Sequence, residues 1–183
     1  MKHKISAKRL SDTLFEIAKN NDSIEDVKTS IIEFDNILRV NNELKSFVQS
    51  KRFSQEQKLA ILMDALGSSF HGFVLGIVSY TSGIKASKII KQVKNNFIDS
   101  YKVMKNIVSI HATFSSEVSE QDLNDIQKKL SSYLNKDAEL TFEVDSSLIG
   151  GAKFRIDNMF LDASIKSQLK NIKSDLMLGS YGY

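Results

Sequence analysis

The stretch YKVMKNIVSIHATF, residues 101–114, contains the point at which the hydrophobic period of the chain changes. Before residue 106, apolar residues recur every three or four positions, which is the spacing of one face of an α-helix. From residue 107 onward every second residue falls on one apolar face, as in a half-buried β-strand. The sequence therefore predicts a mainly α protein with two domains, a helical one over 1–105 and a small α/β one over 106–183.

Upstream of this point the apolar spacing predicts an N-terminal six-helix bundle. The helices are expected at 4–20, 24–38, 44–48, 59–66, 70–81 and 86–105. Capping boxes are expected at Asp22 or Ser23, with Glu25 or Asp26 three positions later, and at Ser54, with Gln57 three positions later. The fifth segment, FHGFVLGIVSY over 70–80, is apolar nearly all round. Such a helix is either central in a bundle or covered by a partner.

Downstream, the pattern predicts the order strand, helix, two or three strands, helix. Alternating apolar residues place strands at 107–114, 139–145, 152–156 and 159–161. Ser119 and Ser164 are suitable N-caps for the two helices. The glycine pair Gly150–Gly151 is interpreted as a sharp entry into a strand that needs positive φ or close backbone approach.

Composition excludes several kinds of active site. The chain of 183 residues contains no cysteine, which excludes disulfides, thiolate nucleophiles and cysteine zinc sites. It has no glycine-rich phosphate loop, and its histidines lack metal-ligand spacing. We therefore predict no catalytic residue, no cofactor and no metal site. A small enzyme with a dispersed active site remains an alternative without a candidate residue.

The charge pattern is that of an ordinary globular protein. Charged residues make up 26% of the chain and the formal net charge is only +3. Lys85, Lys88, Lys91 and Lys94 could bind phosphates, and a basic, helical, nucleic-acid-associated protein is the alternative function. Their spacing of three fans them around a helix, so solvated lysines are the favoured interpretation.

No segment is expected to span a membrane. The most apolar stretch, 70–80, is about half of the roughly 20 residues that a spanning helix needs. Residues 1–10 have no apolar core or cleavage site, so we expect no secretory signal. Any association with a membrane is expected to be indirect, through partners.

The run VDSSLIGGAKFRIDNMFLDASIKSQLKNI, residues 144–172, resembles the C-terminal signature of the delta subunit of bacterial F-type ATP synthases. The mitochondrial relative of that subunit is the oligomycin-sensitivity-conferring protein. The residues that match the signature are Gly150, Gly151, Arg155, Asp162 and Ser164. AKRLSDTLFEIA (7–18) is similar to the family's opening helix, and NNELKSFVQSKRFSQEQK (41–58) to its third and fourth helices.

The resemblance implies a non-catalytic stator subunit of a proton-translocating ATP synthase, at the cytoplasmic face of the bacterial inner membrane. In this family the helical domain binds the N-terminal helix of an alpha subunit of the catalytic head. The C-terminal part binds the b subunits of the peripheral stalk. No nucleic acid is expected as a partner, and contact with the membrane is expected only through the complex.

The family uses its first and fifth helices to bind the alpha subunit. Together with the apolar surplus of the fifth segment, this leads to the hypothesis that five residues form the binding groove. They are Leu14, Ile17, Val74, Ile77 and Val78.

Overall fold

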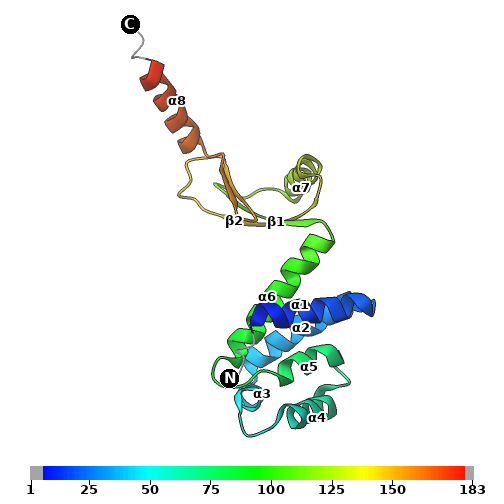
Figure 1. Cartoon of the computed structure of the whole chain (residues 1–183). Coiled ribbons are helices and arrows are strands. Elements are labelled where there is room, and N and C mark those ends of the chain that lie inside the picture. Colours follow the sequence, from blue (N-terminus) through cyan, green and yellow to red (C-terminus); the bar gives the residue numbers. More distant parts are fainter. Residues whose placement is uncertain (1–5, 180–183) are drawn as a thin grey trace. The chain divides into compact units, whose positions relative to one another are not determined.

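The computed structural model describes residues 6–179, which form eight helices and one four-stranded sheet (Figure 1). The chain divides into two compact units, Met1–Lys102 and Val103–Tyr183. The prediction of a mainly helical chain with a small α/β part at its C-terminal end is confirmed. The predicted beginning of the first helix, at residue 4, lies outside the described residues.

The helices of the first unit follow the predicted apolar segments closely. Their bounds are α1 (Ala7–Asn20), α2 (Ile24–Val40), α3 (Asn42–Gln49), α4 (Gln55–Leu66), α5 (Gly72–Ser79) and α6 (Ala86–Met104). α5 is shorter than the predicted segment 70–81 because His71 is its N-cap. The Nδ1 atom of His71 accepts a hydrogen bond from the backbone N–H of Phe73 at 3.3 Å.

Polar side chains fix where several of these helices begin. The predicted capping box of α4 is confirmed: Ser54 Oγ accepts from Gln57 N–H at 3.2 Å, and Gln57 Oε1 accepts from Ser54 N–H at 3.0 Å. The capping box predicted at Asp22 or Ser23 is wrong. Ser23 makes no side-chain cap, and Asp22 has a φ of 51° in the turn that follows α1.

α5 lies at the centre of the helical unit and packs against α1, α2 and α4. Val74 and Leu75 are 0% exposed and Val78 is 2% exposed. Burial of each such side chain contributes about 1.5–3 kcal/mol relative to exposure. Next to them the rings of Phe34 and Phe70 meet edge-on, with centroids 5.5 Å apart. These contacts make α5 the element that joins α1, α2 and α4 into one core.

The buried amine of Lys58 holds the ends of two helices together. This α4 side chain is 2% exposed, and its Nζ donates to the carbonyl oxygens of Val48 at 2.8 Å and Thr81 at 3.0 Å. Val48 lies in the last turn of α3 and Thr81 follows α5, so the amine sits at the negative ends of both helix dipoles. Beside it, Gly83 N–H donates to the carbonyl of Gln49 at 2.8 Å.

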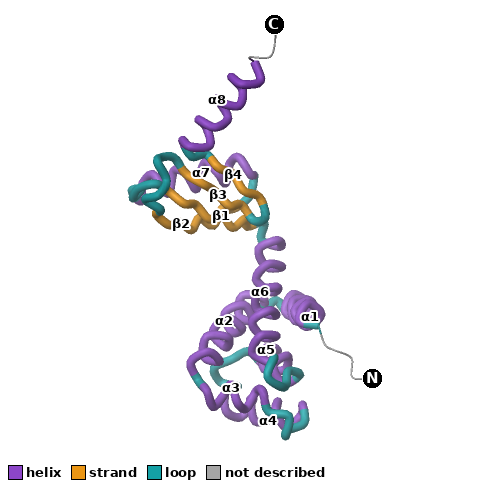
Figure 2. Tube along the Cα trace, turned by 90° about the vertical axis from the view of Figure 1, so that its left-hand side faces the viewer, coloured by secondary structure: helices purple, strands orange, loops and turns teal. Residues whose placement is uncertain are grey.

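The second unit is a mixed sheet with one helix against its apolar face. Its elements are β1 (Ile107–Phe114), α7 (Glu120–Leu134), β2 (Asp137–Val144), β3 (Ala152–Ile156), β4 (Met159–Asp162) and α8 (Ile165–Gly179). The strand order is β2-β1-β3-β4, with β1 and β2 parallel and the other pairs antiparallel (Figure 2). A parallel pair needs a crossover connection, and α7 supplies it.

The core of this unit lies between α7 and the sheet. Val108, Ile110 and Ala138 are each at most 4% exposed, and Leu130 and Leu134 of α7 pack against them. The predicted alternation of β1 is confirmed, because its even-numbered residues are the buried ones. This small core holds the strands of the sheet in register.

We predict that Lys58→Met lowers the free energy of unfolding by about 1–3 kcal/mol, because two buried carbonyl groups lose their donor. Urea denaturation followed by circular dichroism measures this loss. Lys8→Met, at an exposed position of α1, is the control and should change stability little. An equal stability of the two variants would contradict the role of Lys58.

The same residue predicts a pH dependence. Burial lowers the pKa of the Lys58 amine below its ordinary value of 10.5. The unfolded chain then binds this proton more tightly than the folded one. As the pH rises from the lowered pKa toward 10.5, the unfolding free energy of the wild type should therefore rise relative to that of Lys58→Met.

Candidate functional site

A groove between α1 and α5 is the best candidate site of the helical unit. It encloses a cavity of about 410 Å³. α1 contributes Leu10, Thr13, Leu14 and Ile17, and α5 with its C-cap contributes Gly72, Phe73, Gly76, Ile77 and Tyr80. Its walls are mostly apolar, with polar groups only at Thr13 and the phenol of Tyr80. This α1–α5 groove has the chemistry that binds the apolar face of a helix.

Two glycines keep the α1–α5 groove open. A Cβ atom at Gly76 would meet no heavy atom within 4 Å, and one at Gly72 would meet only the side chain of Met63, at 3.6 Å. Glycine inside a helix, as at Gly76, costs about 1 kcal/mol relative to alanine, whereas Gly72 is the first residue of α5. Neither residue needs a positive φ, so backbone conformation does not explain them. What they provide is space between α5 and whatever occupies the groove.

The structure divides the five predicted groove residues into two sets. Leu14, Ile17 and Ile77 line the α1–α5 groove, with Ile17 37% exposed. Val74 and Val78 do not line it, because they point into the core on the other side of α5. The helical period separates the two faces: positions 74, 75 and 78 point inward, and 73, 76, 77 and 80 border the groove.

Sequence reasoning missed Phe73, Gly72, Gly76 and Tyr80 as groove residues, although their spacing of four and three along α5 was visible. The helix is apolar nearly all round, so its period alone did not show which side faces the core.

The signature residues of the second unit build the turn at which α8 begins. Gly151 has a φ of +83°, and a Cβ atom there would lie 2.6 Å from the backbone oxygen of Ala163. The carbonyl of Gly150 accepts a hydrogen bond from Ile165 N–H at 3.0 Å. Only glycine fits so close to the chain in this conformation. The glycine pair thus fastens the start of β3 to the start of α8.

Asp162 and Ser164 complete this turn. Asp162 Oδ1 accepts from the backbone N–H of Ser164 at 3.0 Å, and hydrogen bonding from Ser164 lowers the pKa of the Asp162 carboxyl. Ser164 is 2% exposed, and its Oγ accepts from Ser167 N–H at 3.3 Å as an N-cap of α8. Arg155, by contrast, is exposed on β3 opposite His111. Four of the five signature residues therefore shape the chain, and Arg155 faces solvent.

Beyond α7, the apolar face of the sheet stays open. Phe142 is 48% exposed, Val144 46% and Leu161 54%, and the register places them on the same face as buried Ala112 and Phe114. We call these three residues the open sheet face. On β2 only the Leu140 end of this apolar face packs against the core.

α8 carries a second exposed apolar surface. Its members recur every three or four residues, at Ile165, Leu169, Ile172 and Leu176, and their exposed fractions run from 44% to 68%. We call this set the α8 stripe. An amphipathic helix of this kind normally buries such a stripe against another element. The open sheet face and the α8 stripe are therefore candidate contact surfaces for a partner.

Within residues 6–179, no cluster of three or more histidine, aspartate or glutamate side chains is placed to hold a metal ion. In the same part of the chain, no helix has the length and apolarity that crossing a membrane requires.

Comparison with known proteins gives a consistent result. The family described as ATP synthase delta (OSCP) subunit matches residues 7–176. The ATP synthase subunit delta of Bacillus thuringiensis is 28% identical over 178 residues, which is 97% of this chain and 98% of that protein. The subunit delta of Caldanaerobacter subterraneus is 27% identical over 172 residues, 94% of this chain and 96% of that one.

A solved structure shares the fold. A chain in the cryo-EM structure of the Toxoplasma gondii mitochondrial ATP synthase hexamer aligns with a TM-score of 0.61 at 18% identity. The alignment covers 95% of this chain and 98% of that one.

We predict that Gly151→Ala destabilises the second unit by at least about 1–2 kcal/mol, the cost of a left-handed conformation for a residue with a Cβ atom. The contact with the Ala163 backbone adds to this cost. Hydrogen exchange at the first turn of α8 should become faster. Gly76→Ala is the control and should be neutral or stabilising, because a Cβ atom there meets nothing. Equal protection in both variants would refute the role of the glycine pair.

Proposed function

The chain belongs to the ATP synthase delta (OSCP) subunit family, and on this premise we propose how its two units perform the work of a stator. As a member of this family it is a structural subunit of an F-type ATP synthase and does not itself catalyse the reaction. The α1–α5 groove receives the N-terminal helix of an alpha subunit of the catalytic head. The second unit binds the b subunits of the peripheral stalk, and the complex rests on the cytoplasmic face of the bacterial inner membrane.

The observation that carries the first contact is the α1–α5 groove. It is long enough to border three positions of α1 on the same face, Leu10, Leu14 and Ile17, and it is lined by apolar side chains of two helices. An amphipathic helix recognises such a groove through residues at i, i+3, i+4 and i+7. Gly72 and Gly76 supply the space for its side chains.

The second contact is carried by the open sheet face and the α8 stripe. Both belong to the second unit, and both expose side chains that a folded protein usually covers. Helical stalk subunits that add their own apolar faces would bury these surfaces. A subunit with two contacts also gains from multivalency, because each closed contact raises the effective concentration of the other.

Such an arrangement meets the mechanical requirement of a rotary synthase. The rotor applies torque to the catalytic head, and the head would turn with the rotor unless it were held. A helix that docks through a few well-packed apolar anchors can reach nanomolar affinity, about −12 kcal/mol. The nucleic-acid alternative gains no support from the comparisons, which point to ATP synthase subunits throughout.

For the first contact we predict that Ile77→Asp reduces binding to a catalytic head stripped of this subunit by at least about 100-fold, because a charge then faces the apolar groove. Calorimetric titration measures the affinity. Ile61→Asp is the matched control, since Ile61 is 41% exposed on α4 outside the groove. Gly76→Leu, which fills the groove without entering the core, should also weaken binding. Full affinity in both groove variants would exclude this site.

For the second contact we predict that Leu169→Asp weakens capture of the soluble part of the b subunits by about tenfold or more, since it places a charge in the α8 stripe. Asn171→Asp introduces the same charge on another side of α8 and should bind as the wild type does. Both variants should keep their helical circular dichroism. Undiminished capture by Leu169→Asp would rule out the α8 stripe.

A further inference from the structure

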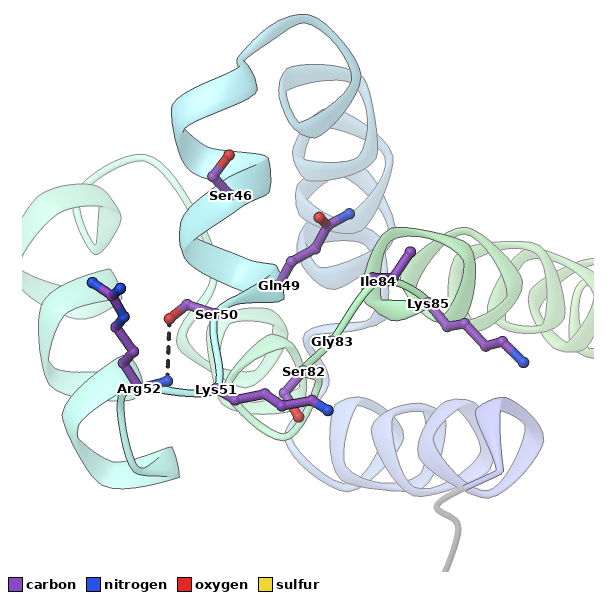
Figure 3. A pocket seen from close by; sticks show the side chains of 9 residues that line it. All are labelled: Ser46, Gln49, Ser50, Lys51, Arg52, Ser82, Gly83, Ile84 and Lys85. Carbon is purple, nitrogen blue, oxygen red and sulfur yellow. Dashed lines mark hydrogen bonds between the residues drawn. The ribbon is translucent and has the colours of Figure 1, made fainter.

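A second surface of the helical unit is strongly basic. A cavity of about 700 Å³ opens between the C-terminal end of α3 and the segment that leads into α6. Lys51, Arg52 and Lys85 line it, together with the hydroxyl groups of three serines (Figure 3). The Lys51 side chain lies along Gly83. A Cβ atom added to Gly83 would be 3.2 Å from the Cε atom of Lys51. Figure 3 shows Arg52 on one side of the cavity and Lys85 on the other, with Lys51 between them, so the three cations border the cavity from different sides.

A neighbouring cavity of about 510 Å³ continues this surface between α2, α3 and α6. Four cationic residues line it, Arg39, Lys45, Lys88 and Lys91. Gln49 lines the first cavity and Ser87 the second, and Gln49 Nε2 donates to Ser87 Oγ at 3.3 Å. The two cavities therefore adjoin. We call them together the α3–α6 basic face.

One carboxylate lines the α3–α6 basic face, and its charge is already compensated. Asp35 is 2% exposed, and its Oδ2 accepts from Arg39 at 2.6 Å and from Lys94 at 2.6 Å. Lys94, one of the four lysines of the sequence pattern, therefore turns inward. Lys88 and Lys91 stay exposed on the face.

The three cations of the first cavity form no ion pair in the described part of the chain. Among residues 6–179, no carboxylate forms an ion pair with Lys51, Arg52 or Lys85, and all three are exposed. The whole chain has a net charge of only +3, so this face concentrates positive charge that the rest of the molecule offsets. Such a concentration attracts anionic partners and accelerates their association.

We propose that the α3–α6 basic face binds an acidic polypeptide segment of a subunit of the catalytic head, as a contact separate from the α1–α5 groove. This inference rests on the proposed function. The lining groups favour a polypeptide over a nucleic acid, because none of the residues that line the two cavities is aromatic and the face lacks the rings on which successive bases stack. Ile84, 91% exposed at the first cavity, offers an apolar anchor instead. Serine, glutamine and asparagine side chains on the face can bond a peptide backbone.

The first test uses the full chain and the stripped catalytic head. The triple variant Lys51→Gln, Arg52→Gln, Lys85→Gln should associate about tenfold more slowly than the wild type at low salt and lose most of its salt dependence. The control Lys128→Gln, Lys129→Gln, Lys136→Gln removes the same charge from exposed positions of the second unit and should change the rate less than about twofold.

The outcomes separate this inference from the proposed function. If the face variant matches the control in rate and salt dependence while Ile77→Asp loses the head, the basic face is no contact and the stator assignment stands. If the wild type does not bind the head, the proposed function fails. The second test then shows whether the basic face binds an acidic polypeptide.

The second test needs no head. A fluorescein-labelled peptide of twelve glutamates should bind the wild-type chain at low salt, as measured by anisotropy, and should bind the face variant at least about tenfold more weakly. A peptide of twelve glutamines should not bind. Equal binding of the glutamate peptide to the face variant and the control would overturn the proposal. The proposal would also be overturned if a single-stranded DNA of twelve nucleotides bound the wild type more tightly than the glutamate peptide does and lost this binding in the face variant.

Discussion

The burial of α5 against α1, α2 and α4 is the constraint on which the helical unit depends. A helix of eight residues has about two turns, and its inward side is filled by Val74, Leu75 and Val78. The remaining apolar side chains must point elsewhere. They point toward α1, where Gly72 and Gly76 leave part of the groove unfilled. The apolar residues of α5 that do not enter the core thus line the groove. The same helix therefore contributes to both the core and the contact surface.

In the second unit, the residues that match the family signature serve the backbone more than a partner. Gly150 and Gly151 allow two chain segments to approach within the space that a side chain would fill, and Asp162 and Ser164 hold the start of α8. The surfaces suited to contact are less distinctive, since they consist of ordinary apolar residues such as Phe142 and Leu169 at helical or strand spacing. The signature residues therefore build turns, and the candidate binding surfaces consist of other residues.

The two surfaces of the helical unit differ in physical character. The α1–α5 groove is apolar and enclosed on two sides, so it suits a contact that dissociates slowly. The α3–α6 basic face is open and charged, so its influence extends over about a Debye length and acts mainly on association. Lys58 links the two surfaces, because its amine donates hydrogen bonds to the C-terminal ends of α3, which borders the basic face, and of α5, which borders the groove. Its buried amine keeps the loops of the basic face in place relative to the helix that forms the groove.

The sequence by itself determined the features that depend on neighbouring residues. The change of period at residue 106, the capping box at Ser54 and the need for glycine at Gly151 follow from local spacing and backbone geometry. Only the tertiary structure decided which side of α5 faces the core, because apolar residues surround that helix and the period gives no preferred side. The pairing of Lys94 with Asp35, 59 positions apart, likewise depends on how α2 packs against α6. A local pattern identifies side chains that must be buried or paired, but the partner that buries or pairs them is supplied by distant parts of the chain.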